Sequence, residues 1–184
     1  MNTIEGITLL TQPDLMADKL YNTGMTPYDE GSEDCKFLST LDGVQLFFNK
    51  ALSVAEIKEI RGHFIERGAM EPNGYMLPGW PEKASRKILS MFGFNGRLAE
   101  VGLDDRLVYN PIDLQIKAYS ESLERWLSEI NYLVECRQLP HGRHFRCCHP
   151  DGTLWADPWP GLDMVDRSPI SSRTALCIIF DKEY

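Results

Sequence analysis

The hydrophobic pattern of the chain changes from helical spacing in its first two thirds to strand-like runs near its C-terminus. Residues 53–68 carry apolar side chains three or four positions apart, which places them on one face of a helix. By contrast, RTALCIIF at 173–180 is a short run of apolar and small residues, typical of a buried strand. Helices followed by strands predict an α+β fold. We expect one domain over residues 1–184.

Turn residues and caps divide the chain into further elements. Ser53 and Glu56 have the spacing of a capping box, which predicts a helix start. We expect a mainly helical support with short strands over 1–130 and a β-rich region that carries the site over 131–184. The patterns predict strands over 4–10, 44–48, 131–139, 144–149 and 173–180, helices over 11–24, 53–68, 81–92 and 112–130, an extended segment over 106–111, and loops over 25–42 and 155–169.

The composition is that of a folded globular protein. Of 184 residues, 43% are hydrophobic and 25% charged. No apolar run approaches the roughly 20 residues that cross a bilayer, and MNTIEGITLL lacks the features of a signal peptide. We therefore expect a cytoplasmic protein with no membrane partner, whose five cysteines stay reduced. The net charge of −8 disfavours a protein-wide surface for nucleic acid.

The stretch HFRCCHPDGT, residues 144–153, gathers side chains that bind metals. On an extended strand, positions i and i+2 point to the same side, so His149 and Asp151 could hold one metal ion together. A second histidine from elsewhere would complete the 2-His-1-carboxylate triad of non-haem iron enzymes.

The context of this motif resembles the prolyl-hydroxylase-like branch of the iron(II)/2-oxoglutarate-dependent dioxygenases. VQLFFNKALSVAEIKEI resembles the strand and capped helix with which that family's domain opens. SLERWLSEINYLVECRQLPHG resembles the helix and strand before the motif, and RTALCIIFDKEY the strand after it. The resemblance covers roughly residues 43–184, and its sharp motif is His149-x-Asp151.

The resemblance implies a fold, a reaction and a set of site residues. The fold is a double-stranded β-helix, a jelly-roll-like sheet with helices packed on it. The reaction is hydroxylation of a protein side chain or a small molecule with Fe(II) and 2-oxoglutarate. His149 and Asp151 are then the metal ligands. Arg173, at the start of the last strand, is assigned to the co-substrate, with a solvated strand end as the alternative.

The chain departs from the family pattern after the last strand. The family's second iron-binding histidine, and the basic residue that pairs with 2-oxoglutarate, lie several strands further on, whereas this sequence ends at Tyr184. We therefore expect an incomplete barrel. The exposed edge of strand 173–180 would need a cover, which segment 4–10, a second copy in a homodimer or a partner chain could provide.

Three other interpretations of the motif stay open. A zinc site could use the cluster Cys136, His141, His144, Cys147, Cys148 and His149, although neighbouring cysteines on a strand face opposite ways. Alternatively, Asp151-Gly152 could simply form a turn after His149. A cysteine nucleophile could pair with His144 or His149, but the sequence identifies no third group to orient the histidine.

A function of another class also fits the composition. The chain could be an acidic interaction or inhibitor protein without turnover, on a degenerate dioxygenase-like scaffold. The absence of a distal histidine and arginine favours this alternative.

Overall fold

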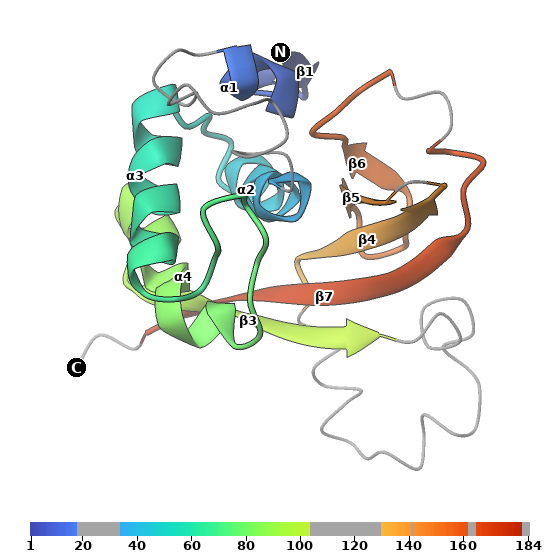
Figure 1. Ribbon diagram of the computed structural model, residues 1–184. Helices are drawn as coiled ribbons and strands as arrows, with labels where there is room; N and C mark the ends of the chain where they lie inside the picture. The colour runs from blue at the N-terminus through green and yellow to red at the C-terminus, as the bar shows by residue number, and fades with distance from the viewer. Residues whose placement is uncertain (18–33, 104–129, 141, 162–164, 182–184) are drawn as a thin grey trace.

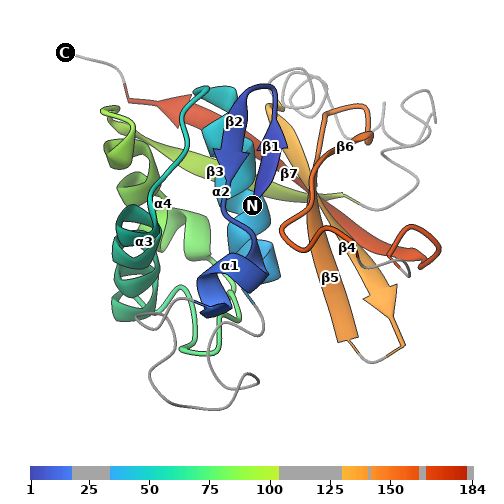
Figure 2. The ribbon, with the colours of Figure 1, turned by 90° about the horizontal axis from the view of Figure 1, so that it is seen from above.

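A computed structural model describes residues 1–17, 34–103, 130–140, 142–161 and 165–181. One helix, α2 (Cys35–Phe47), lies at the centre of this part of the molecule. The helices α3 (Val54–Glu66) and α4 (Trp80–Met91) pack together on one side of it, and an antiparallel sheet lies on the other (Figures 1 and 2). The expected α+β class is confirmed.

The sheet has five strands in the order β3-β7-β4-β5-β6, and every neighbouring pair is antiparallel. Its longest strand, β7, pairs with β3 on one side and β4 on the other. The jelly-roll form is not confirmed, because the remaining described strands make only a two-stranded hairpin. The sheet strands are β3 (Gly96–Leu103), β4 (Tyr132–Leu139), β5 (Gly142–Cys148), β6 (Leu154–Ala156) and β7 (Ile170–Phe180).

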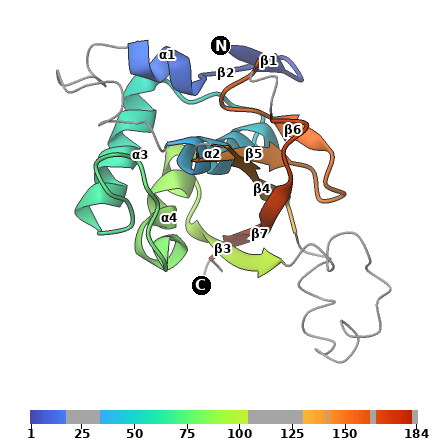
Figure 3. The same cartoon turned by 45° about the vertical axis from the view of Figure 1, so that its right-hand side comes forward.

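The N-terminal hairpin consists of β1 (Asn2–Ile4) and β2 (Ile7–Leu9) and lies near β6 (Figure 3). Helix α1 (Gln12–Ala17) follows it. Thr11 caps this helix, because its backbone amide and hydroxyl both donate to the Asp14 carboxylate. The backbone amide of Gln12 donates a hydrogen bond to the Pro158 carbonyl at 2.7 Å. This bond connects the N-terminal segment to the residues after β6.

Local sequence signals predicted several elements correctly. The capping box of α3 is formed, since the Ser53 amide donates to Glu56 and the Glu56 amide donates to the Ser53 hydroxyl. Helix α4 and strands β4, β5 and β7 lie where the hydrophobic patterns place them. The predicted helix 112–130 and extended segment 106–111 fall almost wholly in 104–129, outside the described residues.

Helix α2 spans Cys35–Phe47, which corrects the predicted strand over 44–48 and the predicted loop over 35–42. The rest of that predicted loop, 25–33, lies outside the described residues. Almost every residue of α2 is buried, including the polar Thr40, Asp42 and Gln45. A helix buried on all sides has no polar face, so its helical period is hidden in the sequence. The short alternation in 44–48 then looked like a strand.

Strand β3 corrects the expectation that segment 4–10 or a second copy covers β7. It pairs with β7 along its whole length, from Gly96 opposite Phe180 to Leu103 opposite Arg173. The other predicted neighbour is confirmed, because β4 pairs with β7 on its opposite side. Among the described residues, no helix combines the length and apolar character that crossing a membrane requires.

Replacing Gly43 by alanine should destabilise the protein by about 1–3 kcal/mol or more. Gly43 lies on α2 against β4, and a Cβ atom there would meet the Tyr132 ring at 2.3 Å. Tyr132 cannot easily move away, since it is fully buried and its hydroxyl donates to the Thr40 carbonyl at 2.8 Å. Urea denaturation measures the change in unfolding free energy.

Gly62→Ala is the matched control for this substitution. Gly62 lies within α3, is exposed, and has open space where its Cβ would be. Alanine there should be neutral or stabilising by up to ~1 kcal/mol, because glycine is a poor helix former. Equal effects of the two substitutions would contradict the close packing of α2 on Tyr132.

Candidate functional site

The His149–Asp151 motif lies in the turn between β5 and β6, not on a strand. The His149 amide donates to the Thr153 carbonyl at 2.8 Å, and the Gly152 amide donates to the His149 carbonyl at 2.9 Å. Gly152 has a φ of 87°, a left-handed conformation that glycine adopts readily. The expectation of an extended i, i+2 pair is therefore wrong, and the Asp-Gly turn interpretation is confirmed.

The side chains of this turn are engaged with neighbours. The His149 ring stacks on Trp155 with 4.5 Å between ring centroids. One Asp151 carboxylate oxygen accepts from the Thr153 hydroxyl at 2.7 Å and from its amide at 2.9 Å, which lowers the pKa of Asp151. No third metal-binding side chain joins them, since the described residues contain no group of three His, Cys, Asp or Glu that could hold a metal. This turn does not fit an iron triad.

Arg173 lies inside the protein rather than at a solvated strand end. Only 1% of it is exposed, and its Nη2 donates to the Glu135 carboxylate at 2.7 Å. Arg146 and Arg137 also donate to Glu135, at 2.9 and 2.5 Å. Burial alone would raise the pKa of Glu135, but the three arginines outweigh it and lower that pKa. Arg173 therefore belongs to a buried ionic network across β4, β5 and β7.

The cysteines of β5 face opposite sides of the sheet, as expected of neighbours on a strand. Cys147 belongs to the apolar core and interacts with Asp42 of α2. Cys148 lies near Glu135 and its arginines, and burial raises its pKa to about 12. Burial also raises the pKa of Cys147. Because the two thiols lie on opposite faces of the sheet, they cannot both bind one zinc ion, which disfavours the zinc interpretation. His141 lies outside the described residues.

His144 forms a pair that the sequence did not reveal. Its Nε2 lies 2.7 Å from Oδ1 of Asp157, which follows β6. The histidine is 3% exposed, and the same Asp157 oxygen also accepts from the Trp159 amide at 2.8 Å. Among the described residues, the His144 ring hydrogen-bonds only to Asp157. Asp157 is therefore the orienting group that the sequence left unidentified.

Cys35 begins the central helix α2, which packs against β5. The backbone amides of Phe145 and Lys36 act to lower the pKa of its thiol. Burial nevertheless dominates and raises the pKa of Cys35 to about 12, with Asp34 and Cys136 adding to the rise. The thiol is therefore protonated at rest.

The face of α2 that carries Cys35 is directed at β5 and the residues after β6. Asp42 lies two turns after Cys35 on this face and is fully buried. Burial raises its pKa, and the negative charge of Asp157 raises it further. Asp157 is thus close enough to α2 to act on it electrostatically. Cys35 lies near Phe145, the strand neighbour of His144, and Asp157 acts on Asp42 of the same helix, although these residues come from distant parts of the sequence.

The sequence analysis missed Cys35 and Asp157 as functional candidates. Cys35 fell within a predicted loop, and a cysteine becomes recognisable as a possible nucleophile only once it lies at a helix start beside a histidine. Asp157 fell within the predicted loop 155–169. Comparison with protein-family models, with curated proteins and with solved structures found no match.

Asp42→Asn should raise the stability of the protein at neutral pH. The raised pKa favours the protonated carboxyl in the folded state, and that contribution is lost as the pH rises above the ordinary Asp value of 3.8. Asparagine at position 42 has no ionisable carboxyl, so this pH-dependent loss of stability disappears. Its side-chain Oδ1 can still accept the hydrogen bond from the Gln45 side-chain amide. We expect a gain of a few degrees in Tm at pH 7.5, equivalent to about 1 kcal/mol for a chain of this size, and a smaller gain at pH 4.

Asp151→Asn, the same chemical change at an exposed turn, is the control. It removes a carboxylate whose pKa is lowered, so it should bring no gain at pH 7.5. A Tm of Asp42→Asn that is lower than wild type at pH 7.5 would contradict the assignment of a protonated Asp42.

Proposed function

We propose that the chain is a cysteine-dependent acyl-transfer enzyme, most simply a hydrolase of amides or esters. The observation that carries the proposal is the His144–Asp157 hydrogen bond, and a buried cysteine begins α2, the helix that packs on β5. A thiol, a histidine base and a third group that orients the histidine are the parts that cysteine nucleophiles use.

In this proposal each residue has one role. Nε2 of His144 donates to the Asp157 carboxylate, so Nδ1 carries no proton and can accept one. Cys35 attacks the substrate carbonyl carbon while its proton passes to His144. His144 then returns this proton to the leaving amine or alcohol, which leaves a thioester on Cys35. Water, deprotonated by His144, hydrolyses the thioester and releases the acid.

The high pKa of Cys35 defines how the nucleophile is activated. A resting thiolate–imidazolium pair is disfavoured, since burial holds the proton on the thiol. Proton transfer therefore accompanies attack, as in enzymes with general-base catalysis. Among the described residues, His144 hydrogen-bonds only to Asp157. In the proposal, a contact between His144 and the thiol forms when substrate binds.

The start of α2 supplies a candidate site for the negative charge of the intermediate. Asp34, at the N-cap position, makes no side-chain hydrogen bond to the first turn. It bonds instead to Arg61, with Nε 3.1 Å from its carboxylate. The backbone amides at a helix start stabilise an oxyanion through their direction and the helix dipole.

A small electrophile should distinguish Cys35 from the other cysteines. We expect iodoacetamide to modify Cys35 preferentially in the folded protein, and Cys35→Ala to abolish this modification. His144→Ala and Asp157→Ala should slow it, His144→Ala by about 10²-fold or more, because the base and its orientation are lost. Intact-mass spectrometry over a time course measures the rates.

Cys148→Ala is the matched control, because Cys148 lies on the same strand but faces the arginine network. It should leave the modification rate unchanged. Labelling that persists in folded Cys35→Ala, or an equal rate in His144→Ala, would contradict the proposed roles.

Iron(II)/2-oxoglutarate-dependent hydroxylation on a jelly-roll-like sheet stays an untested prediction, and we rank it second. In its favour, His149 lies close enough to Asp151 to lower the pKa of that carboxyl. Against it, Asp151 is bonded to Thr153, and Arg173 is bonded to Glu135 rather than open to a co-substrate. The acidic interaction protein also stays a prediction. A partner or second copy is not needed to cover the edge of β7, because β3 pairs with that edge.

Metal analysis of protein purified without chelator tests the second-ranked function. We expect no stoichiometric iron, because the described residues offer only His149 and Asp151 at this turn. Iron bound at one equivalent by the wild type and lost in His149→Ala would reverse the ranking of the two functions.

A further inference from the structure

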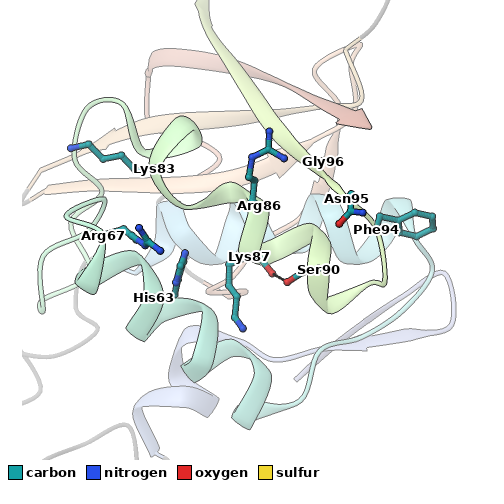
Figure 4. Close-up of a pocket in the computed structure, with 9 residues that line it drawn as sticks. All are labelled: His63, Arg67, Lys83, Arg86, Lys87, Ser90, Phe94, Asn95 and Gly96. Atoms are coloured by element: carbon teal, nitrogen blue, oxygen red, sulfur yellow. Dashed lines mark hydrogen bonds between the residues drawn. The ribbon is translucent and has the colours of Figure 1, made fainter. Parts of the chain in front are cut away.

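A basic pocket lies between α3, α4 and the start of β3, on elements that do not contribute to the candidate active site (Figure 4). It has a volume of about 440 Å³. His63 and Arg67 extend from α3 toward α4, which contributes Lys83, Arg86 and Lys87 (Figure 4). We define these five side chains as the basic pocket.

The charge of the basic pocket is opposite to that of the whole chain. Four of its side chains are permanent cations, and no carboxylate belongs to the residues that line it. The chain as a whole has 27 acidic and 19 basic residues, with a net charge of −8. A positive hollow on an acidic protein is therefore a local feature, not a consequence of composition.

The ion pairs around the basic pocket leave positive charge unbalanced. Lys87 pairs with Glu59, and Arg86 pairs with Asp181. Lys83 donates to the Gly68 carbonyl at 3.2 Å, which carries no net charge. Arg67 forms no ion pair with any described residue and is exposed. Two of the four cations thus have no carboxylate partner within the described chain.

The positive charge of the basic pocket affects the pKa of His63. Burial lowers its pKa most, and the neighbouring cations Arg67 on α3 and Lys87 on α4 lower it further, against an opposite effect of Glu66. The histidine is therefore neutral at pH 7, and it gains a proton more readily when an anion enters and offsets the cations.

We propose that the basic pocket binds a small anionic ligand through a phosphate group. Guanidinium and ammonium groups that line one pocket from two helices offer the donors and the positive charge that bind phosphate oxygens. A small ligand fits better than a nucleic acid, because the net charge of −8 repels a long polyanion. Phe94, at the rim and 43% exposed, offers an aromatic surface on which a nucleoside base could stack.

Calorimetric titration with inorganic phosphate, pyrophosphate and adenosine triphosphate, at constant ionic strength, tests this binding. We expect pyrophosphate to bind at one equivalent, and the double variant Arg67→Gln/Lys83→Gln to bind at least ten-fold more weakly. These residues are exposed, so the variants should keep the wild-type Tm. Tighter binding of the nucleotide than of pyrophosphate would identify a base-carrying ligand, and equal binding would identify the phosphate alone.

Arg143→Gln is the matched control, since it removes one exposed positive charge on β5, outside the basic pocket. It should leave the affinity for pyrophosphate unchanged. The affinity of the wild type relative to His63→Gln should also rise as the pH falls below the ordinary histidine value of 6.5, where His63 takes up a proton beside Arg67, Lys87 and Glu66. Absence of binding by all three ligands, or an equal loss in Arg143→Gln, would overturn the proposal.

Discussion

The packing of α2 against the sheet is the contact on which the rest of the described structure depends. Gly43 lets the helix approach Tyr132 so closely that no larger side chain fits between them. Tyr132 in turn donates to the α2 carbonyl of Thr40, so that apolar packing and a buried hydrogen bond fix the same contact. On its other side α2 meets α3 through the Phe37 and Phe64 rings, 5.4 Å apart. One helix thus joins the helical and β-rich parts of the core.

The two faces of the sheet around β5 have different physical roles. One face packs on α2 through Cys147 and Val134 in the apolar core. The other carries Glu135 and three arginines, whose mutual hydrogen bonds compensate the cost of burying charge. This division explains why Arg173, expected at a co-substrate, has a structural role.

The proposed active site and the basic pocket use different elements and different chemistry. Cys35, His144 and Asp157 come from α2, β5 and the residue after β6, and they are largely buried. The basic pocket is made by α3, α4 and the start of β3, and its cations face solvent. Substitutions in one should leave the other intact, so each proposal can fail alone. Neither site involves the His149–Asp151 turn.

The sequence by itself determined the elements whose signals are local. A helical period with a capping box places α3, a buried apolar run places β7, and Asp151-Gly152 places a turn. Only the tertiary structure decided α2 and the candidate site. A helix buried on all sides shows no polar face, so its period is hidden. The His144–Asp157 pair exists because chain topology brings β5 and the residue after β6 together, which no local pattern encodes.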